Sequence, residues 1–202
     1  DGNNMVNYLR GQKGNESTLY RLREHVLGDF VNSAPAFVSP PSFGFADVVD
    51  SNGTALTTAQ LYATYKTNKA TRQKALYVGA NDGMLHAFNA DTGDEIWAYV
   101  PNMVIPRMSK LASETWGVQH TYSVDGSPIS MDAYDVTAGA WKTVLVGGLN
   151  NGGRGYYALD ITNTTNPIGL WEFCSDSQFC KFSDTDLGET FGNPVITKRA
   201  MD

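Results

Sequence analysis

Two cysteines are the side chains of this chain best suited to redox chemistry or to binding a soft metal. Cys174 and Cys180 are separated by the five residues Ser-Asp-Ser-Gln-Phe. This spacing allows a local disulfide, which would indicate an oxidising compartment such as the periplasm or the cell exterior, or a shared metal ion. Because zinc sites usually use four ligands with closer cysteine spacing, we favour a disulfide between Cys174 and Cys180.

The histidines are the next candidates, for proton transfer or metal binding. His25, His86 and His120 are spread along the chain, and the Gly-x-Ser-x-Gly pattern that presents a nucleophilic serine does not occur. We expect His86 to be a packed or edge residue of a strand, and His120, near a loop, to be the better binding candidate. The sequence therefore predicts no catalytic residue, metal ligand or cofactor-binding residue, and a protein that is not an enzyme.

Two further segments resemble ligand-binding loops. The glycine-rich stretch Gly147–Gly155 is similar to a phosphate loop, but the residues after it read Tyr-Tyr-Ala-Leu-Asp-Ile, which is a strand and not the helix that such a loop requires. The stretch Asp184-Thr185-Asp186 lacks the third acidic residue, the glycine and the distant glutamate of a calcium loop. We interpret the first as a hairpin and expect no calcium at the second.

A repeated pattern determines which elements position these residues. The copy from Ala75 to Trp97 matches the copy from Val144 to Phe173, with Val78 aligned to Val146, Ala87 to Ala158 and Trp97 to Trp171. The offset grows only at turns, so the strands between them stay in register. Short apolar runs separated by turn residues, such as Asn81-Asp82-Gly83, predict a β-meander in each copy.

A Pro-containing segment precedes each meander and predicts a fourth strand. Four short strands in each copy are typical of a propeller blade. We expect an all-β fragment of a propeller: a lead-in over 1–30, blade one over 31–101, a bridging segment over 102–123, blade two over 124–173, a disulfide loop over 174–180, and the first strand of blade three over 189–198. The structural repeat residues are Gly79, Asp82, Gly83, Ala87, Thr92, Gly93, Trp97, Gly147, Ala158, Asp160 and Trp171. Trp97 and Trp171 are expected to pack between neighbouring blades.

Blade one is longer than blade two because of an insertion over 40–74. Thr57 to Lys66 within it predicts a short helix capped by a threonine. We interpret the insertion as a decoration at the propeller edge, with a ligand-contacting loop as the alternative. Val104 to Ala112 predicts a second short helix, which bridges the blades.

Composition narrows the class of partner. The 202 residues carry a net charge of −6, with 18% charged residues, 11% aromatic residues and 20 glycines. This suits a turn-rich all-β protein, and without a basic stripe we expect no nucleic acid partner. No apolar run is long enough to span a membrane and no signal peptide opens the chain. Since propellers typically close with four to eight blades, we expect this chain to be a piece of a larger protein.

Several motifs in order carry a family resemblance. Leu27-Gly28-Asp29-Phe30-Val31-Asn32-Ser33-Ala34-Pro35, Tyr77 to Phe88, Val124-Asp125-Gly126-Ser127-Pro128 and Gly153 to Asp160 resemble the start of the C-terminal propeller of the PilC/PilY family of type IV pilus tip and biogenesis proteins. The resemblance runs from Asn7 to Pro194, which is nearly the whole chain.

The resemblance implies a modified seven-bladed, quinoprotein-like propeller at the outer membrane and pilus tip. It also implies a role in promoting pilus assembly against retraction, in attachment and in twitching motility. The implied partners are pilin or minor-pilin subunits and a host-surface ligand, with peripheral association with the outer membrane. A regulatory calcium ion belongs to an Asp-rich loop in a later blade of the family, so no cofactor is expected in this segment, and the partner-binding residues stay unknown.

Two alternatives stay open. Gly83, Leu85, Ala87, Thr92, Gly93 and Trp97 also fit the blade pattern of quinoprotein dehydrogenases, but those enzymes have an adjacent Cys-Cys pair, which this sequence lacks. The second alternative is an outer-membrane assembly scaffold of the same propeller type without adhesive activity.

Overall fold

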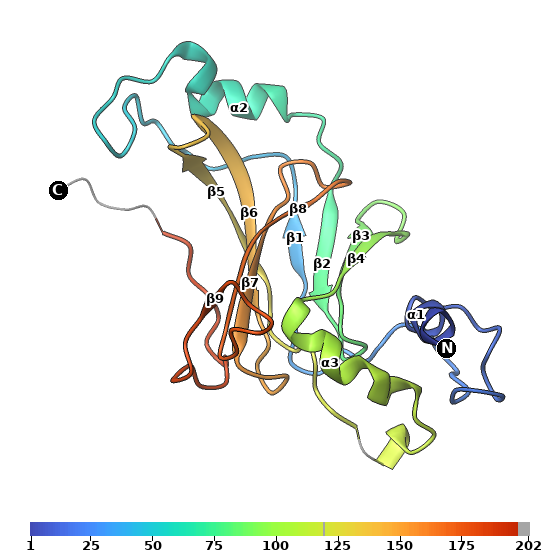
Figure 1. The fold of residues 1–202 in the computed structure, drawn as a ribbon. Helices are drawn as coiled ribbons and strands as arrows, with labels where there is room; N and C mark the ends of the chain where they lie inside the picture. The colour runs from blue at the N-terminus through green and yellow to red at the C-terminus, as the bar shows by residue number, and fades with distance from the viewer. Residues whose placement is uncertain (119, 198–202) are drawn as a thin grey trace.

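Two β-sheets lie side by side in the computed structural model, which describes residues 1–118 and 120–197 (Figure 1). The first sheet has the order β1-β2-β3-β4, made of β1 (Ala36–Val38), β2 (Ala75–Gly79), β3 (Leu85–Asn89) and β4 (Glu95–Tyr99). The second has the order β5-β6-β7-β8-β9, made of β5 (Ile129–Asp135), β6 (Ala140–Gly148), β7 (Gly155–Asp160), β8 (Ile168–Cys174) and β9 (Phe182–Ser183). All neighbours are antiparallel except β8 and β9. The predicted all-β fold with two antiparallel meanders is confirmed.

The two meanders repeat one hydrogen-bonding register. Ala87 pairs with Trp97 across β3 and β4, and Ala158 pairs with Trp171 across β7 and β8. Each pairing is followed by a bulge, after Ala87 in blade one and after Ala158 in blade two. A bulge adds local twist, and its recurrence at one place identifies the sheets as copies of one unit.

One detail of the predicted alignment is wrong. Val146 pairs with Ala158 as Tyr77, and not Val78, pairs with Ala87. Both strands contain Val-Gly, and aligning these letters places the two copies one residue away from the alignment that the hydrogen bonds show. The hydrogen-bonded register depends on the position of the hairpin turn and not on residue type. The counterpart of Gly79 is therefore Gly148 rather than Gly147.

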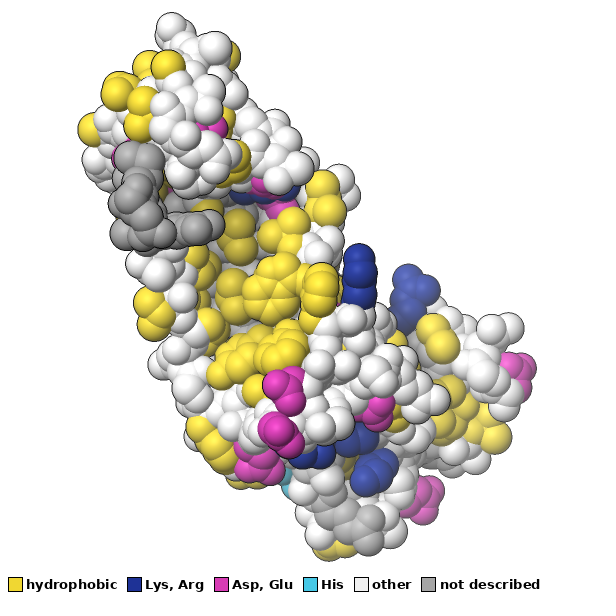
Figure 2. All heavy atoms as spheres, turned by 60° about the vertical axis from the view of Figure 1, so that its left-hand side comes forward, with side chains coloured by type: hydrophobic (Ala, Val, Ile, Leu, Met, Phe, Trp, Pro, Cys, Tyr) yellow, Lys and Arg dark blue, Asp and Glu magenta, His cyan; other side chains and the backbone are white. Residues whose placement is uncertain are grey.

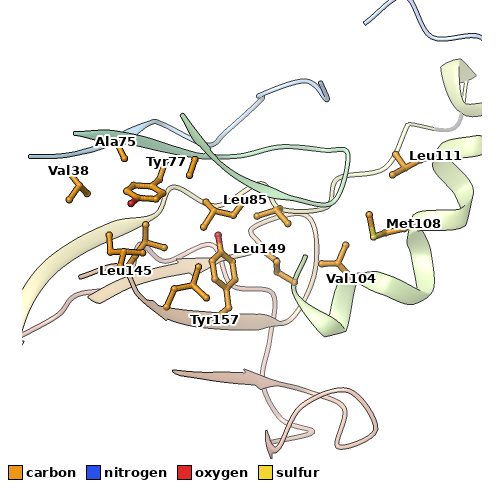
Figure 3. Close-up of a cluster of buried hydrophobic side chains, with 14 residues drawn as sticks. Val38, Ala75, Tyr77, Leu85, Val104, Met108, Leu111, Leu145, Leu149 and Tyr157 are labelled. Carbon is orange, nitrogen blue, oxygen red and sulfur yellow. The ribbon is translucent and has the colours of Figure 1, made fainter. Parts of the chain in front are cut away.

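The main core lies between the sheets. Tyr77 and Leu85 from blade one and Leu145 and Tyr157 from blade two point toward one another, as Figure 3 shows. Val104 closes one end of this layer from the bridging segment. Fully burying each such side chain stabilises the fold by roughly 1.5–3 kcal/mol, so the blade-to-blade contact contributes to stability through several buried side chains.

Short helices decorate the sheets, and the larger ones are visible in Figure 1. The predicted helix from Thr57 to Lys66 is divided into η1 (Thr58–Gln60) and α2 (Tyr62–Asn68), because Leu61 is extended. The predicted helix from Val104 to Ala112 is helical in the structure, as a short α-helix followed by a 3₁₀-helix. The other helices of the described residues are α1 (Gly2–Leu9), η2 (Asn102–Val104), α3 (Ile105–Met108), η3 (Ser109–Ala112) and η4 (Trp116–Val118). No helix in this described part combines the length and apolar character needed to cross a bilayer.

The stretch expected to open a third blade, 189–198, is not a regular strand in its described part. Thr190 forms an isolated bridge with Asn150, and residues 191–197 do not belong to a regular strand. Lys198 lies outside the described residues. Isolated strands are not stable without neighbours, so a third blade starting here stays a prediction. The parallel strand β9 was not predicted.

Candidate functional site: the faces and clasps of the two blades

Trp97 links blade one to blade two. Its indole Nε1 donates a hydrogen bond to the carbonyl oxygen of Thr164 at 2.8 Å, in the turn between β7 and β8. Its ring lies against Tyr77, with centroids 5.6 Å apart. Next to it, Tyr99 packs on the Tyr157 ring and bonds the Glu172 carboxylate. This face of blade one is thus covered by blade two.

The opposite face of blade two is open, and Figure 2 shows a hollow lined by hydrophobic side chains on this side of the molecule. Trp171, the counterpart of Trp97, is 39% exposed. It lines a shallow groove of about 500 Å³ together with Val144, Val146, Tyr156 and Phe173. The expectation that Trp171 packs between blades is not met within the described residues, because no further blade covers this face.

The insertion over 40–74 forms a clasp on blade two. We use this name for Gln60, Tyr62 and Tyr65 together with Asp132 and Thr143 of blade two. The Tyr62 hydroxyl donates to the Asp132 carboxylate at 2.6 Å, and the Tyr65 and Thr143 hydroxyls are 2.7 Å apart. Burial and the bond to Asp132 both raise the pKa of Tyr62. The clasp is therefore a buried polar contact with fixed geometry.

Aromatic rings reinforce the clasp. Trp141 of β6 packs against both Phe45 and Tyr62, with centroid distances of 5.2 and 4.7 Å, and its Nε1 donates to the Gln60 carbonyl oxygen at 2.9 Å. The prediction of a surface decoration missed this reach into blade two. The sequence carries no signal for this reach, because the aromatic residues of 40–74 are no denser than the 11% of the whole chain.

The turn Asn81-Asp82-Gly83 joins the lead-in to blade one. The Asp82 carboxylate accepts from the Gly28 amide at 2.8 Å, and Asn81 donates to the Asp29 carboxylate at 2.9 Å. Gly83 has a φ of +94°, a conformation that disfavours residues with a side chain. In the other turn of blade one, Thr92 bonds Asp94 at 2.7 Å and Gly93 has a φ of +82°. Asp82 and Thr92 thus act through their side chains, and the two glycines act through the backbone conformation of their turns.

His86 is buried between two carboxylates. Its Nδ1 lies 2.6 Å from Glu95 Oε1, and its Nε2 lies 3.0 Å from Asp82 Oδ2. Burial of the ring lowers its pKa, but the hydrogen bonds and charges of Asp82 and Glu95 outweigh burial and raise the pKa above 6.5. The prediction of a packed strand residue missed these partners, although Asp82 and His86 at the two sides of a tight turn were a usable signal.

His120 lies near the surface, with its Nε2 3.0 Å from Asp29 Oδ2 and its ring against Trp116 and Tyr122. Burial opposes ionisation of Asp29, but bonds from Asn81 and His120 outweigh it and hold the pKa of Asp29 below 3.8. Gln119, next to His120, lies outside the described residues. Among the described side chains, no group of three or more His, Cys, Asp or Glu residues has a geometry that could hold a metal ion.

Cys174 and Cys180 form a disulfide, with their Cα atoms 5.8 Å apart. Both residues are buried, and Cys180 Sγ lies 3.8 Å from Met103 Sδ in the bridging segment. The amide of Asp184 bonds the Cys174 carbonyl oxygen at 3.0 Å. The disulfide thus joins the end of β8 to the segment that forms β9.

The remaining repeat residues lie in or beside the strands of blade two. Ala158 is fully buried in β7, and the Asp160 carboxylate accepts from the Thr162 amide at 2.9 Å. Gly147 faces the Tyr157 ring so closely that a Cβ would lie 2.3 Å from its hydroxyl. The glycine-rich stretch that follows connects β6 to β7, as the hairpin interpretation expects.

Comparison with known proteins identifies the relatives of this pair of blades. The family model described as the PilY1 beta-propeller domain matches residues 27–201. The chain is 40% identical over 198 residues to a type IV pilus biogenesis factor PilY1 homolog of Xylella fastidiosa, and 39% identical over 200 residues to type IV pilus biogenesis factor PilY1 of Pseudomonas aeruginosa strain UCBPP-PA14. These matches cover 96% and 98% of the chain but only 15% and 16% of the two relatives.

A solved structure is also similar. The crystal structure of the Pseudomonas aeruginosa PilY1 C-terminal domain matches 67% of this chain and 24% of its own, with a TM-score of 0.51 and 38% sequence identity.

Proposed function

Because the chain belongs to the PilY1 β-propeller domain family, we propose that it forms two blades of a type IV pilus biogenesis factor. Its contribution is binding and not turnover: the blades form a rigid platform whose loops and faces contact other polypeptides. The observation that carries this proposal is the 38–40% identity to proteins named as PilY1 or its homologues over 96–98% of the chain.

The finer features of the proposal follow the family resemblance. The full-length protein would promote pilus assembly against retraction and support adhesion and twitching motility, from a position at the outer membrane and pilus tip. Pilin or minor-pilin subunits would be its partners, with a host-surface ligand in addition. The buried disulfide Cys174–Cys180 supports an envelope or surface location, because disulfides persist in oxidising compartments.

Deletion of the gene in the source bacterium tests this proposal. We expect surface pili, counted by electron microscopy, and twitching zones to be lost, and full-length protein to restore both. In a background that cannot retract pili, the same deletion should leave more pili than in the retracting background. Normal piliation after deletion in the retracting background would contradict a role in biogenesis, whereas equal loss in both backgrounds would contradict only the opposition to retraction.

A further inference from the structure

The outer edge of blade one is an open strand edge. β4 lies at the side of the first sheet opposite β1 (Figure 1), and its strand neighbour among the described residues is β3. Within the same described part of the chain, no backbone hydrogen bond joins β4 to a segment other than β3. Backbone N–H and C=O groups that are unpaired at a sheet edge can accept a further strand.

Blade two shows what such an edge accepts. β8, the counterpart of β4, is covered by β9, which runs parallel to it and pairs with its last two residues. The segment that supplies β9 follows β8 directly and is tied to its end by the disulfide. After β4, in contrast, the chain turns at Pro101, and the Asn102 amide donates to the Glu172 carboxylate of blade two at 3.0 Å. The segment that follows β4 is thus used to hold blade two and not to cover β4.

The backbone groups of Ala98 face outward at this edge. In blade two the Asp184 amide donates to the Cys174 carbonyl oxygen at 3.0 Å, so the backbone groups of Cys174 face β9. Those of Glu172, two residues earlier, face the same side, because backbone groups alternate in direction along a strand. Ala98 is the counterpart of Glu172, since each follows the tryptophan of its blade in the ladder. Ala98 is also an exposed residue, so this part of the edge is accessible.

The edge is rigid and lacks the residues that commonly protect an edge from strand addition. Trp97 and Tyr99 hold β4 against blade two through the contacts described above. Little ordering of the edge is therefore needed when a strand is added. Residues 95–99 contain no proline, lysine or arginine, the residue types that most often block such an edge.

Charge favours one kind of added segment. The carboxylates of Asp91, Asp94 and Glu95 lie at the end where β4 begins. Lys74 Nζ lies 3.2 Å from Asp91 Oδ1, and His86 Nδ1 lies 2.6 Å from Glu95 Oε1. Asp94 accepts a hydrogen bond from a threonine hydroxyl but forms no ion pair within the described residues. A segment that runs parallel to β4, as β9 runs along β8, and begins with Lys or Arg places a cation near Asp94.

We propose that the open edge of β4 binds an extended segment of another polypeptide, in the parallel direction, with β-branched or apolar residues at alternate positions and a basic residue at its amino end. Another polypeptide is favoured because the segment of this chain that directly follows β4 is already engaged by Glu172. This surface would serve the platform role proposed above, on which the choice of another polypeptide rests.

Ala98→Pro in the purified full-length protein tests the edge. Proline removes an N–H that points away from β3 and leaves the hydrogen bonds to β3 in place. Ala98→Val is the conservative variant, which keeps the N–H. The probe is the synthetic peptide Lys-Val-Thr-Val-Thr-Val, and we expect it to bind Ala98→Pro at least about tenfold more weakly than Ala98→Val, because main-chain hydrogen bonds supply the affinity in this mode of binding. If Ala98→Pro does not fold, Ala98→Lys replaces it, since a lysine at an edge also opposes strand addition.

Hydrogen exchange at the Ala98 amide, measured by mass spectrometry with fragmentation, gives a readout specific to strand addition. We expect saturating probe peptide to slow this exchange about tenfold or more in the wild type. Equal binding of the probe to Ala98→Pro and Ala98→Val, or no slowing at Ala98, would overturn the proposal. Slow exchange at Ala98 in the protein alone would also overturn it, since the same polypeptide would then cover the edge. The peptide Glu-Val-Thr-Val-Thr-Val should bind several-fold more weakly, and equal binding would overturn the basic residue.

The same variants separate this edge from the pilus role. In the deletion strain we expect full-length Ala98→Val to restore surface pili to the wild-type number and Ala98→Pro to restore several-fold fewer. Full restoration by a folded Ala98→Pro protein would overturn the edge as a docking site and leave the pilus role in place. Normal piliation of the deletion strain would contradict the pilus role, and the peptide measurements would then decide on the edge alone.

Discussion

Each ring nitrogen of His86 faces a carboxylate, and this arrangement favours the doubly protonated ring because an ionised carboxylate only accepts hydrogen bonds. The His86 side chain is 5% exposed and the Asp82 side chain 15%, so the Asp82 charge acts on the ring with little screening, whereas the half-exposed Glu95 carboxylate is screened more by solvent. Since Asp82 also binds the Gly28 amide, the protonated ring helps to fix the turn that holds the lead-in.

The pH dependence of stability follows from this geometry. The folded-state pKa of His86 is raised above 6.5, so its contribution is fully present below about pH 6.5 and is lost as the pH rises through the raised pKa. Each unit of the shift corresponds to about 1.4 kcal/mol. We expect the free energy of unfolding of the wild type to exceed that of His86→Gln by more at pH 6 than at pH 9. His25→Gln, at an exposed histidine, is the control. A difference between wild type and His86→Gln that does not change with pH, or the same pH dependence in His25→Gln, would argue against stabilisation by the protonated His86 ring.

A second prediction concerns one hydroxyl group of the clasp, that of Tyr62. Tyr62→Phe removes the hydroxyl that donates to buried Asp132, and it leaves a carboxylate with one donor fewer. We expect a loss of about 1–3 kcal/mol in the free energy of unfolding by urea. Tyr134→Phe is the matched control, because the Tyr134 hydroxyl accepts from Gln60 at 2.9 Å in a partly exposed place, and its loss should cost about 1 kcal/mol or less. Equal losses in the two variants would show that Asp132 is not the partner that matters.

The disulfide and β9 act together on the edge of blade two. In the chain-entropy model, closing so short a loop stabilises by about 2 kcal/mol. We expect Cys174→Ala with Cys180→Ala to lose about that much and to speed hydrogen exchange at the Asp184 amide, which bonds the Cys174 carbonyl oxygen. Ser177→Ala, in the same loop, is the control. Unchanged exchange at Asp184 in the double variant would mean that β9 holds its place without the disulfide.

The meanders were predictable from sequence because their signals are local. Turn residues such as Asn81-Asp82-Gly83 and alternating apolar residues fix hairpins within about 25 residues of chain. The reach of the insertion was not predictable, since Tyr62 and Asp132 are 70 residues apart and neither residue type requires the other. The strand β9 was missed for a similar reason: two residues carry no periodicity, and their pairing depends on the disulfide beside them.

The exposure of Trp171 could not be predicted from the sequence either. Trp171 and Trp97 stand at the same position of the repeat, so the pattern predicts the same environment for both rings. In the structure the environment of each ring is set by the next blade, and within the described residues Trp97 has such a neighbour and Trp171 does not. A fully buried ring at Trp97 would make Trp97→Ala cost about 3–5 kcal/mol in the free energy of unfolding, and we expect a smaller loss because the ring is only partly buried.

The stacking of successive blades depends on close backbone approach at one glycine in each unit. At Gly79 a Cβ would meet the rigid Val124 carbonyl oxygen at 2.3 Å, whereas at Gly169, in β8, nothing lies within 4 Å. We therefore expect Gly79→Ala to push blade two away from blade one and to destabilise by about 1–3 kcal/mol, the usual cost of overpacking. The structure also implies that the loss should come with faster hydrogen exchange at the Val124 amide, which bonds the Ala80 carbonyl oxygen at 3.3 Å.

Gly169→Ala is the control for the general effect of replacing a strand glycine, and we expect it to change stability by less than about 0.5 kcal/mol. Gly148→Ala is the informative third variant. Its Cβ would lie 3.2 Å from the Thr190 carbonyl oxygen and 3.0 Å from the Tyr156 ring, which is a milder clash. A graded order of destabilisation, largest at Gly79, smaller at Gly148 and smallest at Gly169, would follow from blades that stack through this contact. Equal effects at Gly79 and Gly169 would mean that the blades are held by their side chains alone.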